Sequence, residues 1–130
     1  SGETGAYLTS HPDVAKISFT GSVPTGSKIM KSAADGIRNI TLELGGKSPL
    51  VIFDDANLKN AVKGAMMANF FTQGQVCSNA ARVFVQRGIY LEFLKAFVSQ
   101  AKRMKIGDPF HDDTTVGATI SEDHAQKVSS

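Results

Sequence analysis

The chain has 130 residues, of which 42% are hydrophobic and 20% are charged, and its formal net charge is +2. The apolar content excludes a disordered tail, and the weak charge gives no electrostatic reason to expect a nucleic-acid partner. A single cysteine excludes an internal disulfide, and no apolar run approaches the roughly 18 residues that a membrane span needs. The length suits one ordinary domain. However, the chain starts without methionine and stops inside a predicted helix, so we expect a piece of a longer protein. We expect that protein to be cytoplasmic, although its true N-terminus is not part of this sequence.

Short β-like runs alternate with longer helical stretches, a pattern that is typical of an α/β fold. In chain order we expect a helix end over 3–11, strands over 16–20, 37–44, 50–53 and 82–86, and helices over 23–35, 58–69, 89–105 and from 121 onward. Gly36 is the expected stop of the helix over 23–35. The run 50–53 is continuously apolar, as in a strand that is covered on both faces. Asp54, Asp55 and Asn57 are expected to cap the helix that follows. Any domain boundary is expected within 45–49.

The segment 19–26 (FTGSVPTG) passes from a strand into a helix. Gly21 permits a tight turn, Ser22 is a natural N-cap, and Pro24 fits the first helical turn. The free amides and the dipole of such a helix end attract phosphate. The residue order matches neither the P-loop nor the standard dinucleotide fingerprint. An ordinary capped helix is the alternative interpretation.

The single cysteine, Cys77, lies between a predicted helix and a predicted strand, in the segment 74–79 (GQVCSN). A lone cysteine usually behaves as a small buried hydrophobe. Here the neighbours are small or polar and include a glycine, which favours an irregular backbone that presents a thiol and a backbone N–H to a ligand. A thiolate is the strongest side-chain nucleophile near neutral pH, so Cys77 is a candidate nucleophile.

Glu43 lies between two leucines in the segment 42–47 (LELGGK). An apolar wall around the carboxylate would raise its pKa and suit it to general-base work, whereas pairing with a lysine or arginine is the structural alternative. No histidine is placed to partner Cys77, so a Cys–His hydrolase is poorly supported. One cysteine and three scattered histidines make no ligand spacing, so we expect no metal.

Together these segments resemble the NAD(P)-dependent aldehyde dehydrogenase family. The segment 42–47 looks like its glutamate signature, 70–77 (FFTQGQVC) like its cysteine signature, and 19–26 like its cofactor turn. The 34 positions from Glu43 to Cys77 are also the family's usual separation. The resemblance covers essentially the whole chain and is greatest to the betaine-aldehyde and 4-trimethylaminobutyraldehyde dehydrogenase branch.

The resemblance implies a Rossmann-like parallel-sheet architecture represented by parts of two domains. Residues 1–47 would be the C-terminal part of an NAD-binding domain. Residues 48–130 would be the N-terminal part of a catalytic (thiol) domain. The parent protein would be a homo-oligomer that acts on a small-molecule aldehyde and has no nucleic-acid or membrane partner.

Residue roles also follow from the resemblance. Cys77 matches the nucleophile that forms a thiohemiacetal and then a thioester, and its N–H matches half of the oxyanion hole. Glu43 matches the general base that activates water. Positions that match contacts to the cofactor, NAD with NADP as an open alternative, are Gly21, Ser22, Thr25, Gly26 and Leu44. Positions that match the lining of the aldehyde channel are Phe71 and Val76.

Several site residues of the family have no match in this chain: an upstream asparagine, an upstream lysine and a downstream glutamate. One alternative is therefore that the 130-residue chain by itself is an incomplete, non-catalytic fragment. A further alternative is a cysteine-dependent ester hydrolase that needs no cofactor.

Overall fold

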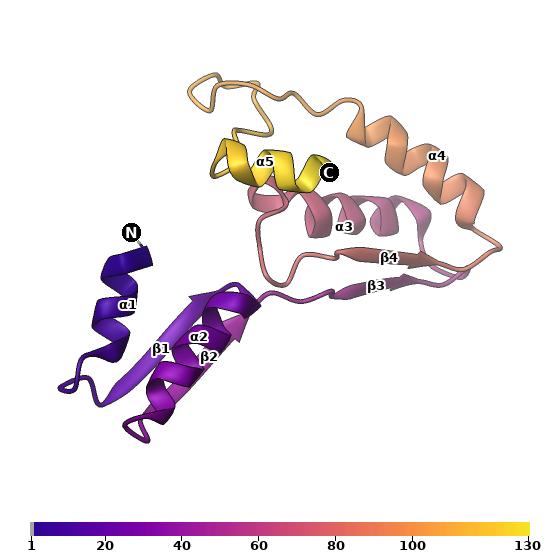
Figure 1. Ribbon diagram of the computed structural model, residues 1–130. Coiled ribbons are helices and arrows are strands. Elements are labelled where there is room, and N and C mark those ends of the chain that lie inside the picture. The colour runs from indigo at the N-terminus through magenta and orange to yellow at the C-terminus, as the bar shows by residue number, and fades with distance from the viewer. Residues whose placement is uncertain (1) are drawn as a thin grey trace. The chain divides into compact units, whose positions relative to one another are not determined.

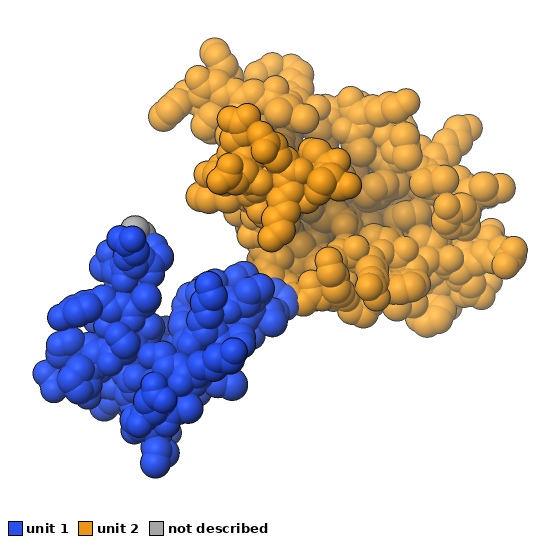
Figure 2. Space-filling view, viewed as in Figure 1, with its two compact units in different colours: residues 1–45 blue, residues 46–130 orange. Residues whose placement is uncertain are grey.

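The computed structural model describes residues 2–130 and divides the chain between Gly45 and Gly46 into two compact units (Figure 2). The first unit contains α1 (Gly2–Ser10), β1 (Lys16–Gly21), α2 (Val23–Ala34) and β2 (Asn39–Leu44). The second unit contains β3 (Pro49–Ile52), α3 (Leu58–Phe70), the 3₁₀ turn η1 (Phe71–Gly74), β4 (Arg82–Val85), α4 (Tyr90–Ala101) and α5 (Glu122–Ser129) (Figure 1). Each unit is built on two parallel strands, which confirms the predicted α/β class.

In the first unit, β1 and β2 pair in parallel from Lys16 opposite Asn39 to Gly21 opposite Leu44. Helix α2 forms the crossover that a parallel pair requires. The buried core of this unit consists of Ile17 on β1 together with Ile29 and Ala33 on α2. Because side chains alternate along a strand, every second residue of β1 is at least partly buried, and Ile17 and Phe19 pack against the core residues of α2.

Helix α1 is held to its unit by polar contacts, since it contains no buried residue. Ser32 Oγ on α2 donates to the carbonyl of Thr9 at 3.2 Å. The guanidinium group of Arg38 donates to the carbonyl of His11 at 3.1 Å and to that of Ser32 at 2.6 Å. Arg38 therefore joins the end of α2 to the segment that follows α1.

The strand predicted from residue 37 begins two residues later, at Asn39. Ile37 N donates to Ala34 O at 3.1 Å and Arg38 N to Ala33 O at 3.0 Å, the two hydrogen bonds of a Schellman helix end. That motif needs one residue with a left-handed backbone, shortly after the helix end. Ile37 occupies this position, with φ of 49° and a side chain that is 95% exposed. Gly36, the expected helix stop, lies one position too early.

In the second unit, β3 and β4 pair in parallel from Pro49 opposite Arg82 to Ile52 opposite Val85, with α3 in the crossover. Its core consists of residues from β3, both long helices and the turn before α4: Ile52, Val62, Ala65, Ile89 and Phe93. Phe97 stacks on Phe93 and on Phe70, which joins α4 to the end of α3. Helix α4 ends at Ala101, earlier than the predicted residue 105.

The expectation that the strand over 50–53 is covered on both faces is wrong for the described residues. Ile52 is buried against the helices, but its neighbours Val51 and Phe53 are 53% and 62% exposed. Within this unit, only one face of the sheet has helices packed on it. Of the expected caps, Asn57 accepts from Asn60 N at 3.0 Å, whereas Asp54 instead hydrogen-bonds Gln86 at the end of β4.

Candidate functional site

The carboxyl ends of β1 and β2 bring the predicted cofactor turn and the glutamate segment to one edge of the first sheet. Gly21 is opposite Leu44 in the strand register, and Gly45 N donates to Gly21 O at 3.3 Å. Thr20 is opposite Glu43. Ligands of open parallel sheets bind outside this end of the strands, so this edge is the expected place for a bound nucleotide.

Helix α2 begins directly at this edge and offers free backbone donors. Ser22 has the extended backbone of an N-cap, but its hydroxyl bonds the hydroxyl of Thr25 at 3.0 Å rather than a backbone amide. The first intrahelical hydrogen bond runs from Gly26 N to Ser22 O at 2.9 Å. The N–H groups of Val23 and Thr25 precede that bond, which leaves them available to an anion.

The role of Gly26 is close packing against the Leu44 side chain rather than a turn. A Cβ built on Gly26 would stand 2.8 Å from Cδ2 of Leu44, closer than real Cβ contacts allow. Glycine thus lets the first turn of α2 approach the end of β2. The predicted cofactor residues Gly21, Ser22, Thr25, Gly26 and Leu44 all belong to this one corner of the first unit.

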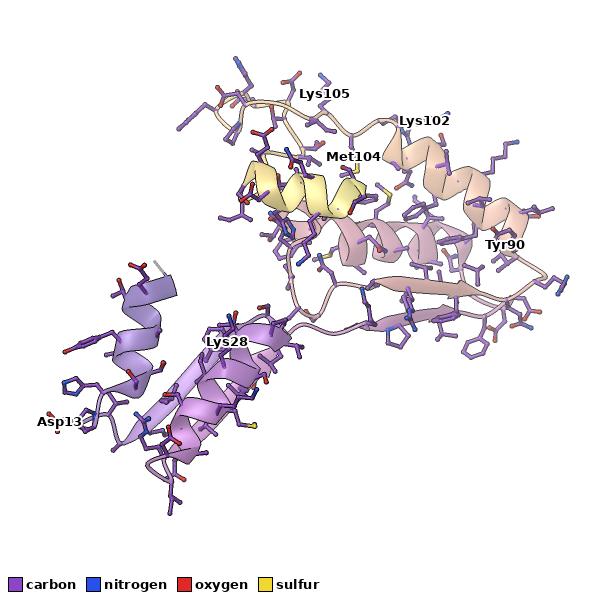
Figure 3. The ribbon with its side chains drawn as sticks, viewed as in Figure 1. Asp13, Lys28, Tyr90, Lys102, Met104 and Lys105 are labelled. Atoms are coloured by element: carbon purple, nitrogen blue, oxygen red, sulfur yellow. The ribbon has the colours of Figure 1, made fainter. Side chains whose placement is uncertain are left out.

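A cavity of about 810 Å³ is lined by residues of α1, α2 and β1 in the same unit. Thr25, one of the predicted contacts to the cofactor, is part of its wall, as are Tyr7, Phe19 and Lys28. Figure 3 labels Lys28 on α2. The sequence predictions did not include Tyr7 or Lys28. The signal that could have found Lys28 is its spacing of three from Thr25, which places both on one face of the helix.

The predicted nucleophile Cys77 is exposed, on the loop between η1 and β4. Among the described residues, neither its thiol nor its backbone N–H makes a hydrogen bond. Phe71 is the first residue of η1, which leads into this loop, and it is exposed. Val76 is half-buried next to the cysteine in the chain. The second unit therefore brings together the nucleophile and both residues predicted to line the aldehyde channel.

Glu43 is exposed on β2 in the first unit. Its neighbours Leu42 and Leu44 are half-buried, because successive strand residues point to opposite faces. The two leucines therefore do not form the apolar wall that their position in the sequence suggested. Glu43 and Cys77 belong to different units, one on each side of the Gly45–Gly46 division in the chain.

Residues 2–130 show the features of neither a metal centre nor a membrane-spanning helix. No group of three His, Cys, Asp or Glu side chains is arranged to hold a metal ion within this range. Nor does that range contain a helix long and apolar enough to cross a membrane.

Comparison with known proteins identifies the family. The family model described as "Aldehyde dehydrogenase family" matches residues 1–130. The chain is 62% identical over 125 residues to 4-trimethylaminobutyraldehyde dehydrogenase of Rattus norvegicus, a match that covers 96% of this chain and 25% of the relative. It thus spans about a quarter of the length of the curated relatives that it matches.

Solved structures give the same result. The chain matches a crystal structure of betaine aldehyde dehydrogenase from Staphylococcus aureus in complex with NAD+, with a TM-score of 0.94 and 43% identity over 98% of this chain and 26% of that one. It also matches an NADP-dependent enzyme of E. coli, with a TM-score of 0.93 and 41% identity over 98% of this chain and 27% of that one. This chain belongs to the aldehyde dehydrogenase family.

Proposed function

We propose that the full-length protein oxidises an aldehyde to the carboxylic acid, with Cys77 as nucleophile and Glu43 as general base. The observation that carries this proposal is the exposed Cys77 on an irregular loop, whose thiol and N–H have no hydrogen-bond partner within residues 2–130. A nucleophile that forms a covalent intermediate must reach the substrate, and a free N–H beside it can stabilise the oxyanion that develops.

The chemistry follows from these two groups. The Cys77 thiolate adds to the aldehyde carbon, the carbonyl oxygen takes the negative charge, and the Cys77 N–H donates to that oxygen. NAD(P)+, when bound, supplies the acceptor for the hydride that leaves this carbon, which becomes a thioester. Glu43 then takes a proton from water, the oxygen of that water bonds to the thioester carbon, and the C–S bond breaks. The products are the carboxylic acid and the free Cys77.

The first unit fits a dinucleotide on structural grounds. The N-terminus of α2 offers the N–H groups of Val23 and Thr25 to a pyrophosphate, and the cavity that Thr25 lines has apolar and hydroxyl walls. The carbonyl of Leu44, at the same edge, is the proposed acceptor for the nicotinamide amide. We propose NAD as the cofactor, as in the Staphylococcus aureus structure, with NADP as the alternative that the E. coli enzyme represents.

The domain assignment belongs to the same proposal. Residues 1–47 are proposed as the last part of an NAD-binding domain and residues 48–130 as the first part of a catalytic domain. The division of the structure into two compact units after Gly45 supports this assignment. The names of the similar proteins suggest trimethylammonium aldehydes as the first substrates to test, namely 4-trimethylaminobutyraldehyde and betaine aldehyde.

The test is NADH formation by the full-length protein and by two alanine variants of the same loop. Cys77→Ala removes the nucleophile and is expected to lower kcat by at least about 10³-fold. Ser78→Ala removes an exposed hydroxyl next to it and should leave kcat close to wild type. Full turnover by the Cys77→Ala protein would refute the assignment. Ester hydrolysis without aldehyde oxidation or any need for NAD(P)+ would favour the hydrolase alternative.

A further inference from the structure

The loop that carries Cys77 has an unfavourable backbone conformation. Three successive residues are left-handed: Thr72 with φ of 50°, Gln73 with φ of 55° and Gly74 with φ of 74°. For the two residues that have a side chain, this conformation costs on the order of 1 kcal/mol or more each. Such a conformation persists only where surrounding contacts hold it in place.

Hydrogen bonds within the loop and to α3 hold the two ends of the loop in place. Asn79 Nδ2 donates to the carbonyl of Phe71 at 3.2 Å, which ties the end of the loop to its beginning. Ala80 N donates to Ala68 O at 2.8 Å, which anchors the loop end to α3. Gln75 N donates to Thr72 O at 3.0 Å, across the left-handed segment. Asn79 N also donates to Val76 O at 3.0 Å, which closes a turn around Cys77. Of these four bonds, only the one from Ala80 leaves the loop, and it anchors the end that follows Cys77.

One hydrogen bond does connect the loop to a distant part of the chain. Oε1 of Gln75, two residues before Cys77, accepts from the backbone N–H of Ile120 at 3.0 Å. In Figure 1, α5 is drawn beside the turn that follows α3, and this hydrogen bond joins the loop to the residues just before α5. The partner of Gln75 is therefore a backbone group 45 positions further along the chain.

The segment around Ile120 is itself held on both sides. Before it, Ile106 and Val116 form an isolated bridge, and Lys105 pairs with Asp113 to close the intervening loop. Figure 3 labels Lys105 on this segment. After it, Ser121 Oγ accepts from His124 N at 3.2 Å and caps α5. Ile120 N thus provides a fixed donor rather than the end of a free loop.

We propose that Gln75 is a positioning residue for the thiol, acting through its hydrogen bond to Ile120. This inference rests on the proposed function, in which Cys77 is the nucleophile. Loss of the bond frees the tip of a strained loop, and a misplacement of about 1 Å at a reacting group can cost about 100-fold in rate. The expected defect lies in catalysis, because Gln75 is outside the unit that is proposed to bind the cofactor.

The matched test compares Gln75→Met with Gln73→Met in the full-length protein. Both changes replace an amide by a thioether of similar length in the same loop, but among the described residues only Gln75 has a side-chain hydrogen bond to lose. For Gln75→Met we expect kcat to fall by about 10- to 100-fold, with KM for NAD+ within about twofold of wild type. Gln73→Met should keep kcat within about twofold.

A second measurement reads the hydrogen bond directly and needs no activity. Because the side-chain amide of Gln73 lies beside Gly117, the peptide to follow is 118–124, which leaves that glycine out. Its hydrogen exchange should accelerate in Gln75→Met and remain at the wild-type rate in Gln73→Met. The proposal is overturned if Gln75→Met keeps wild-type kcat, or if the two variants lose kcat equally. If the wild-type protein oxidises no aldehyde, the proposed function fails, while the exchange result still decides whether Gln75 holds the loop to Ile120.

Discussion

Gly26 lies against the side chain of Leu44, the residue whose carbonyl is proposed to hold the nicotinamide amide. A Cβ at position 26 would stand 2.8 Å from Cδ2 and 3.2 Å from Cδ1 of that leucine. The start of α2 and the end of β2 are therefore packed as closely as a glycine allows. This contact therefore joins the two parts of the proposed cofactor site, namely the N-terminus of α2 and the residue that carries the Leu44 carbonyl.

A first prediction concerns this contact. Gly26→Val should push the Leu44 side chain out of place, and overpacking of this kind costs about 1–3 kcal/mol. We expect a higher Kd for NAD+, measured by calorimetry on the full-length protein. Gly64→Ala on α3 is the control, because a Cβ there meets nothing within 4 Å. An unchanged Kd in Gly26→Val would contradict the role given to this packing.

A second prediction concerns Arg38, which hydrogen-bonds the carbonyls of His11 and Ser32. Hydrogen bonds to a charged group contribute about 1.5–3 kcal/mol, and a lysine lacks the planar fork that reaches both carbonyls. Arg38→Lys should therefore loosen α1, which lines the first unit's cavity. The expected result is about tenfold faster hydrogen exchange in a peptide covering residues 2–10, with weaker NAD+ binding.

The control for Arg38 is Arg103→Lys. Arg103 is exposed in the second unit, and its side chain makes no hydrogen bond among the described residues. Equal exchange in the two lysine variants would show that Arg38 does not hold α1.

The parts of the site that are local in sequence could be predicted, and those that depend on tertiary contacts could not. The turn at Gly21 and the segment around Leu44 were both assigned to the cofactor from the resemblance, and the parallel register of β1 and β2 brings them together. The exposure of Cys77 was consistent with its small and polar neighbours. In contrast, the bond from Gln75 to Ile120 spans 45 positions and leaves no periodic signal.

The residue types also did not predict where the backbone is left-handed. A pattern based on glycine predicts Gly36 as the stop of α2, but the helix register assigns the left-handed position to Ile37. Thr72 and Gln73 are likewise poor candidates for positive φ by residue type. At Ile37 the hydrogen bonds of the helix end outweigh the preference of the residue type, and at Thr72 and Gln73 the hydrogen bonds of the loop do so.

A third prediction separates the two chemical steps. Glu43→Gln keeps the size of the side chain but removes its basicity, so thioester formation should proceed while hydrolysis slows by about 10²- to 10⁴-fold. Rapid mixing of enzyme, aldehyde and NAD+ should then show a burst of NADH equal to the number of active sites, followed by slow turnover. Glu92→Gln, at an exposed acid on α4, should show wild-type turnover. Rapid steady-state turnover by Glu43→Gln would remove this residue from the mechanism.

The last prediction concerns the 130-residue chain by itself. Val51 and Phe84 are opposite each other in the β3–β4 register, and they are 53% and 52% exposed on the face of the sheet that α3 and α4 leave bare. An apolar face of this kind is expected to associate, so the isolated chain should form oligomers and produce no NADH. Phe84→Lys should lower its sedimentation coefficient toward that of a monomer. Ile37→Lys, the same kind of change at an exposed apolar residue of the first unit, should not. A wild-type chain that sediments as a monomer and reduces NAD+ would show instead that these residues form a complete enzyme.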